Sequence, residues 1–205
     1  MTYRLDWATA DIDGRSTVTD GSGSLGVTVS TPKAVDGRSW HVADIPGDHD
    51  ALRSDCASEE TVVEVSFDAP VSDVSFEIYD VDSGDCWDDN VKVIALDAHG
   101  NEVPVRFTHT EAWHHVDGNS IEAEGNGGPG VDGPGAADSV MVHIDAAIVS
   151  LKIIHSPGDD FEQAGTIGLS ELCFSAAPPV SDGIVSGTAG DDLIDLAYTG
   201  DPDGD

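Results

Sequence analysis

Apolar and polar residues alternate along short stretches of this chain, and turns rich in Asp, Gly and Pro separate the stretches. The clearest runs, which are rich in β-branched residues, are Thr61–Phe67, Val74–Tyr79 and Asn90–Leu96. Such a period of two places successive side chains on opposite faces of a strand, so each run predicts a half-buried β-strand. No long segment carries the i, i+3, i+4, i+7 spacing of an amphipathic helix. The pattern therefore predicts an all-β fold.

Further strands are expected on both sides of these runs. They are Val103–Phe107, Ser139–Ile144, Val149–Ile154 and Gly168–Phe174, with weaker candidates at Arg15–Thr19, Leu25–Ser30 and Ser120–Ala123. The two runs at Ser139–Ile144 and Val149–Ile154 are expected to pair with each other. About ten short strands joined by tight turns predict an antiparallel β-sandwich, and a jelly-roll-like arrangement is the commonest one at this size.

The composition changes near the end of the chain. Ala176-Ala177-Pro178-Pro179 reads as a short linker, and the residues after it are rich in Gly and Asp and poor in apolar side chains. We therefore expect a sandwich domain over 1–175, a linker over 176–180 and an acidic tail over 181–205. A length of 205 residues with 39% hydrophobic side chains suits one core and a tail.

The charge is strongly one-sided, with 40 Asp and Glu against 8 Lys and Arg and a formal net charge of −32. Such a negative field disfavours nucleic acid and anionic membrane surfaces as partners. No apolar stretch approaches the roughly 18–20 residues that a membrane-spanning helix needs. The start of the chain also lacks the basic and apolar regions of an ordinary secretory signal. A cytosolic protein, or export through a signal elsewhere, is expected.

The acid is mostly Asp, which favours turns and oxygen cages over helices. The densest acidic stretch joins two of the clearest strands, and its Asp residues are Asp80, Asp82, Asp85, Asp88 and Asp89. Calcium takes 6–8 oxygen ligands, and closely spaced carboxylates would repel one another without a cation among them. The stretch predicts a Ca²⁺ site. A solvated acidic surface that only keeps the protein soluble is the alternative.

Two other residue types near this stretch have open interpretations. Trp87 either forms a stacking platform for a sugar ring on the calcium loop or covers the edge of the sandwich. Three cysteines allow at most one intramolecular bridge, and the favoured pair is Cys56 with Cys86, since Cys173 lies in a strand-like stretch. Unbridged thiols are the alternative.

The tail contains a second calcium signal. Gly187–Asp195 fits the nonapeptide Gly-Gly-x-Gly-x-Asp-x-apolar-x of the parallel β-roll, with Thr188 at the second Gly position. In this motif the chain resembles the RTX (repeats-in-toxin, haemolysin-type calcium-binding) family. The resemblance implies that Asp192 binds Ca²⁺ and that export uses a type I system reading a C-terminal signal. Only one good repeat is present, and a roll needs several.

The body has a looser resemblance. The stretch from Val62 to Asp97 and the closing Gly168–Phe174 resemble β-sandwich modules at the front of secreted RTX-type proteins, some of which are followed by a self-splicing Hint-type domain. This resemblance implies a sandwich and an extracellular location. It also leads us to expect a longer precursor that carries the export signal outside this chain.

These observations lead to three hypotheses about function. The first is a non-catalytic, extracellular, calcium-binding β-sandwich for adhesion, glycan binding or matrix attachment. The second is a calcium-bridged structural subunit of an extracellular filament or surface layer, in which neighbouring subunits are the partners. The third and least favoured is an enzyme acting on polysaccharide, because 40 acidic residues make any catalytic carboxylate pair uninformative.

Overall fold

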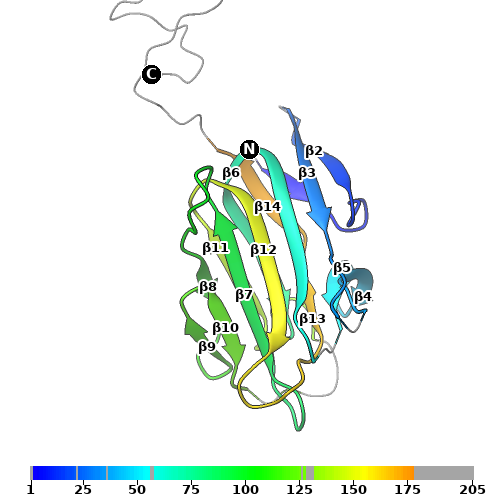
Figure 1. Cartoon of the computed structure of the whole chain (residues 1–205), viewed down its shortest axis with the longest axis vertical. Coiled ribbons are helices and arrows are strands. Elements are labelled where there is room, and N and C mark those ends of the chain that lie inside the picture. The colour runs from blue at the N-terminus through cyan, green and yellow to red at the C-terminus, as the bar shows by residue number, and fades with distance from the viewer. Residues whose placement is uncertain are drawn as a thin grey trace, which may run out of the picture.

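The structure, a computed structural model, describes residues 2–177 apart from 22, 36, 56, 57, 126 and 128–131. This described part contains strands and no helix, and every strand pairing in it is antiparallel (Figure 1). In chain order the strands are β1 (Tyr3–Leu5), β2 (Arg15–Thr19), β3 (Ser24–Ser30), β4 (His41–Ile45), β5 (Asp48–Ser54), β6 (Thr61–Tyr79), β7 (Asp89–Leu96), β8 (Arg106–Thr108), β9 (His114–Asp117), β10 (Ser120–Ala123), β11 (Val140–Ile144), β12 (Ile148–Pro157), β13 (Ile167–Leu169) and β14 (Leu172–Ala176).

The long strand β6 builds both layers of the fold. Its first half, through Ser66, lies between β3 and β12, and its second half lies between β11 on one side and β13 and β14 on the other. The strand curls over at one end of the molecule (Figure 1), where the stretch from Asp68 to Pro70 interrupts the alternation of buried side chains. Asp73 follows with a positive φ of 53°. One strand therefore passes from the first layer into the second.

The two layers enclose one large apolar core, and Ile45, Ala51 and Tyr79 form a separate small cluster. The first layer runs β2-β3-β6-β12-β7-β10-β9, and the second contains β8-β11-β6-β14-β1. In this second layer β13 also pairs with the C-terminal end of β6, and β5 and β4 follow β13 in the sheet. Val63 and Val65 from the first half of β6 and Phe76 and Ile78 from the second half all face this core. The alternation read from the sequence is what places them there. The fold class is an all-β antiparallel sandwich, as predicted.

Several predicted strands are confirmed, but three details differ. The predicted strands Thr61–Phe67 and Val74–Tyr79 form the one continuous strand β6. The predicted pairing of β11 with β12 is wrong, because β11 pairs with β6 and β8 while β12 pairs with β6 and β7. The last predicted strand is interrupted at Ser170, whose hydroxyl accepts a hydrogen bond from the backbone N–H of Glu77 at 2.9 Å.

The short strands β1, β4, β5 and β9 had no recognisable sequence pattern. β5 reads Asp-His-Asp-Ala-Leu-Arg-Ser and has no β-branched residue, and β1 has only three residues. The strand predicted over Val103–Phe107 begins only at Arg106. Asn119 explains part of this later start, because its side chain hydrogen-bonds the backbone carbonyl of Val103 and the backbone N–H of Val105.

Strand β14 ends at Ala176. The tail over 181–205, with its RTX-like motif and Asp192, lies outside the described residues, as does Cys56 of the predicted Cys56–Cys86 pair. Within the described part, no helix is long and apolar enough to cross a membrane.

Phe174 joins the two layers, and we expect its removal to be costly. It is fully buried, stacks on Tyr3 at a centroid distance of 5.7 Å and meets Phe67 edge-on at 5.0 Å. Phe174→Ala should lower the free energy of unfolding by about 3–5 kcal/mol, measured by urea denaturation. Phe161, which is 36% exposed, gives the matched control, since Phe161→Ala should change stability by only about 0.5 kcal/mol.

Candidate metal centre

The acidic stretch predicted from the sequence lies at the end of the sandwich where β6 leads into β7. It forms a narrow hairpin, closed by a bridge between Ser83 and Asp88 and a hydrogen bond from the Gly84 N–H to the Trp87 carbonyl at 2.9 Å. Asp80 begins the hairpin with a positive φ of 63°, a conformation that Asp tolerates better than most residues. The turn therefore redirects the chain directly after β6.

Three buried carboxylates meet at the base of this hairpin. Asp80, Asp82 and Asp138 have ligand oxygens within 4.8 Å of one another, and their side chains are only 3–4% exposed. Asp138 comes from the segment before β11, and its backbone carbonyl accepts a hydrogen bond from the Val81 N–H at 3.0 Å. We call these three residues the buried cluster. It joins two segments that are more than fifty residues apart in sequence.

Neighbouring groups hold the buried cluster in place. The exposed residue Asp132 donates its backbone N–H to Asp80 Oδ1 at 2.8 Å. The Nε2 atom of His114 lies 3.1 Å from the carbonyl oxygen of Val81 and 3.2 Å from that of Asp138. Burial lowers the pKa of His114. The ring is therefore neutral near pH 7 and supports the backbone on both sides of the cluster.

The buried cluster is electrostatically incomplete. Burial, reinforced by the other carboxylates, raises the pKa of Asp80 to about 8 and that of Asp82 to about 7. It raises the pKa of Asp138 as well. Among the described residues, no group hydrogen-bonds Asp82 Oδ2 or Asp138 Oδ1, although both atoms are buried. A hard divalent cation would neutralise these oxygens and supply the missing partner, so the donor set fits Ca²⁺.

The backbone at Gly127 closes over the buried cluster. Its N–H donates to the Ser83 carbonyl at 2.8 Å, and a Cβ atom placed there would lie 1.4 Å from Asp82 Oδ2. Only glycine fits this approach without moving Asp82. Gly127 therefore has a specific role beside the carboxylates.

The structure separates the five Asp residues predicted to share one loop site. Asp80 and Asp82 belong to the buried cluster, whereas Asp88 lies in a second acidic group with Asp159 and Asp160. Asp85 is exposed at the hairpin tip beside Cys86. Asp89 belongs to neither group, although its Oδ2 accepts a weak hydrogen bond from the Asp82 N–H at 3.4 Å.

Asp89 anchors the hairpin to the core through a buried polar chain. Its Oδ1 accepts hydrogen bonds from the Gly165 N–H at 2.6 Å and from His155 Nε2 at 2.8 Å. The other ring nitrogen of His155 lies 2.8 Å from Ser54 Oγ, which in turn lies 2.7 Å from Thr61 Oγ1. All four side chains are buried. These hydrogen bonds fix the start of β7 and do not present any of the four side chains to a ligand.

Trp87 packs within the hairpin and remains partly exposed. Its ring passes close to the backbone of Gly84 and Gly165, where added Cβ atoms would lie 2.2 Å and 2.7 Å from ring atoms. Its Nε1–H donates to Asp82 Oδ1 at 3.0 Å. The tryptophan therefore positions one carboxylate of the buried cluster.

We expect Trp87→Phe to keep most of the packing and lose the hydrogen bond to Asp82. The free energy of unfolding should fall by about 1–3 kcal/mol, because the acceptor is a buried carboxylate. Urea denaturation in excess chelator measures this loss. A Trp87→Phe protein as stable as the parent chain would show that the hydrogen bond contributes nothing.

The sequence interpretation missed the residues that complete these sites. Asp132 lies in the glycine- and proline-rich stretch 125–135, which reads as a surface loop, and Asp138 lies between that stretch and the next predicted strand. Asp159 and Asp160 follow Pro157 and Gly158 at the end of β12. An Asp pair in a turn after a strand was the one available signal, but only the fold brings it next to Asp88.

Comparison with known proteins gave structural matches alone. No family model and no curated protein matches this chain. Among solved structures, the module TmCBM27, described for specific mannan recognition, matches at 13% identity with a TM-score of 0.41, over 85% of this chain and 95% of its own. The galactotriose complex of TmCBM61 matches at 14% identity with a TM-score of 0.30, over 84% and 95%.

A third match is an isomalto-dextranase from Arthrobacter globiformis T6 in complex with panose. It has 13% identity and a TM-score of 0.33, and the alignment covers 85% of this chain but only 32% of the enzyme. The identities and TM-scores of all three matches are too low to assign any of these activities to the chain.

Proposed function

We propose that this chain is a non-catalytic, extracellular β-sandwich module that binds Ca²⁺ through Asp80, Asp82 and Asp138. The observation that carries the proposal is the buried cluster itself, in which three carboxylates meet below the surface. Two of their buried oxygens have no hydrogen-bond partner among the described residues. Burying such oxygens without a partner is costly, whereas calcium is bound by oxygen atoms of this kind.

Calcium at the buried cluster would act on the loops of this end of the sandwich. Asp80 and Asp82 belong to the β6–β7 hairpin, and Asp138 belongs to the segment before β11. One ion bound by all three would hold these segments together and favour the folded state. Folding would then be strongest where calcium is plentiful, as it is outside cells. The RTX-like tail with Asp192 would respond to the same ion.

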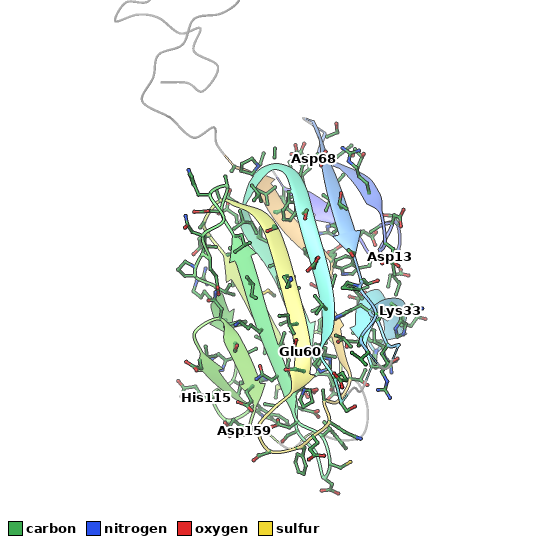
Figure 2. The ribbon with its side chains drawn as sticks, viewed as in Figure 1. Asp13, Lys33, Glu60, Asp68, His115 and Asp159 are labelled. Carbon is green, nitrogen blue, oxygen red and sulfur yellow. The ribbon has the colours of Figure 1, made fainter. Side chains whose placement is uncertain are left out.

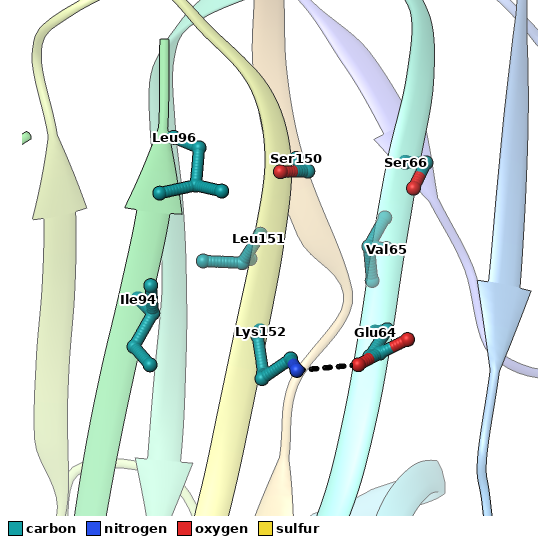
Figure 3. A pocket seen from close by; sticks show the side chains of 8 residues that line it. All are labelled: Glu64, Val65, Ser66, Ile94, Leu96, Ser150, Leu151 and Lys152. Carbon is teal, nitrogen blue, oxygen red and sulfur yellow. Dashed lines mark ion pairs between the residues drawn. The ribbon is translucent and has the colours of Figure 1, made fainter. Parts of the chain in front are cut away.

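A glycan is the partner that we propose for the module. The outer face of β6, β12 and β7 carries a shallow hollow, in which apolar Leu96 lies beside Ser150 and apolar Ile94 lies beside Lys152 (Figure 3). Lys152 and Glu64 close one end of the hollow as an ion pair of 2.6 Å. Sugars combine apolar ring faces with hydroxyl groups, and this lining offers a surface for each.

A glycan array separates the two surfaces that could bind. We expect the intact chain to retain specific glycans in millimolar Ca²⁺. Lys152→Ala should abolish retention if the hollow is the binding surface. Trp87→Ala should do so if the Trp87 ring stacks on the sugar, and its Ca²⁺ binding is measured alongside because Trp87 also positions Asp82. An array with no specific signal in calcium would contradict glycan binding and leave calcium binding to be judged separately.

A structural subunit remains the second candidate function because the sandwich has open edges. Within the described residues, β2 pairs only with β3, β8 only with β11 and β9 only with β10. Such edges can accept a strand from a neighbouring chain. Light scattering after size exclusion, with and without Ca²⁺, tests this function. Calcium-dependent growth in mass would favour the subunit over a monomeric module.

A further inference from the structure

A second group of carboxylates lies at the same end of the sandwich. Ligand oxygens of Asp88, Asp159 and Asp160 lie within 4.8 Å of one another. Asp88 directly precedes β7, and the other two follow β12, where Figure 2 labels Asp159 at the lower end of the molecule. Glu122 from β10 stands beside them, and its Oε1 accepts a hydrogen bond from the Asp159 N–H at 2.7 Å.

Asp88 is the buried member of this second group. Its side chain is 1% exposed, and its Oδ2 accepts a hydrogen bond from the Asp160 N–H at 3.2 Å. Its Oδ1 is buried and has no hydrogen-bond partner among the described residues. The backbone of Gly158 approaches so closely that an added Cβ would lie 2.2 Å from Asp88 Oδ2 and 2.8 Å from Glu122 Oε1. The turn thus folds tightly around an unsatisfied carboxylate.

We propose that Asp88, Asp159 and Asp160 form a second divalent-cation site, separate from the buried cluster. Asp88 would be its buried anchor, while the exposed Asp159 and Asp160 would bind the ion from the solvent side. Ca²⁺ suits this set better than Mg²⁺, because Ca²⁺ accepts irregular coordination by carboxylates, whereas Mg²⁺ demands near-ideal octahedral geometry. The ion would join the turn after β12 to the start of β7.

The solvent-facing ligands give this second site a different character. Exposed carboxylates hold an ion more weakly than buried ones, because water and salt screen the attraction. Three carboxylates also leave coordination positions that water fills. The second site should therefore bind after the buried cluster in a calcium titration and should weaken more in high salt. It shares no ligand with the buried cluster, so it does not depend on the proposed function.

Isothermal titration calorimetry with CaCl₂ on the chelator-treated full chain tests this proposal. We expect the parent chain to bind one more ion than the double variant Asp159→Asn, Asp160→Asn, and the lost event to be the weaker one. Asp85→Asn is the matched control, because Asp85 is an exposed acid of the same hairpin. It should keep the parent stoichiometry.

The outcomes also separate the two sites. Loss of one ion in the double variant supports the second site whatever Asp138→Asn does. If Asp138→Asn binds as the parent chain does, that result counts against the buried cluster and not against the second site. A double variant that binds as many ions as the parent chain, with the same affinities, overturns the second site. Mg²⁺ in place of Ca²⁺ should give no heat at this site, and equal binding of both ions would contradict the assignment to calcium.

Discussion

Calcium is expected to raise the melting temperature of the chelator-treated chain by about 5–10 °C. An ion present at one hundred times its dissociation constant adds about 2.7 kcal/mol to stability. For a domain of this size, each kcal/mol shifts the melting temperature by about 2–4 °C. The shift arises because the ion neutralises Asp80, Asp82 and Asp138, which the fold buries together. Differential scanning calorimetry in excess chelator and in millimolar Ca²⁺ measures it.

Asp138→Asn distinguishes a bound ion from a general salt effect. It removes one charge from the buried cluster and leaves the side-chain shape unchanged. In chelator this variant should melt at or above the parent temperature, since one repulsive carboxylate is gone. In calcium it should gain little, whereas Asp85→Asn should gain as much as the parent chain. Equal calcium shifts in all three proteins would contradict binding at the buried cluster.

The second large effect concerns pH. In excess chelator, stability should fall by about 3–4 kcal/mol between pH 6 and pH 8. Burial raises the pKa of Asp82 to about 7 and that of Asp80 to about 8, both above the ordinary value of 3.8 that the unfolded chain restores. A raised pKa in the folded state contributes stability that is complete below about pH 4 and is lost as the pH rises through 7 and 8. Urea denaturation at several pH values measures the slope.

Calcium should remove this pH dependence, because the ion favours the ionised carboxylates. Exposed Asp and Glu are already ionised at pH 6, so they add little to the slope in this window. Asp82→Asn cannot ionise, so in chelator it should reduce the slope and leave the part that comes from Asp80. A parent chain whose stability is equally pH-dependent with and without calcium would show that the buried carboxylates do not bind the ion.

The strand pattern made the fold class predictable. Val63, Val65, Phe76 and Ile78 alternate with polar neighbours, and all four face the core. The order of the strands was not predictable, because the same alternation is compatible with many pairings. The curl of β6 at Asp68–Pro70 illustrates the difference, since those residues read as a turn between two strands.

The acidic hairpin was recognisable from the sequence, but the division of its Asp residues between two separate groups was not. Asp80 and Asp82 stand close to Asp88 in sequence, yet the hairpin directs them to different neighbours. Each site is completed by residues far along the chain, Asp138 for one and Asp159 with Asp160 for the other. Spacing within one loop carries no information about such distant partners. Burial, which decides the pKa values of these groups, also appears only in the folded chain.

The most direct test of a calcium-binding module is equilibrium dialysis of the purified chain against ⁴⁵Ca²⁺ at pH 7.5, after removal of metal by chelator. We expect at least one tightly bound ion per chain, and we expect Asp138→Asn to lose that ion while Asp85→Asn keeps it. Absence of bound calcium at millimolar concentration would contradict calcium binding by this fold. Protons would then neutralise the buried carboxylates only in part, and the acid on the surface would serve solubility alone.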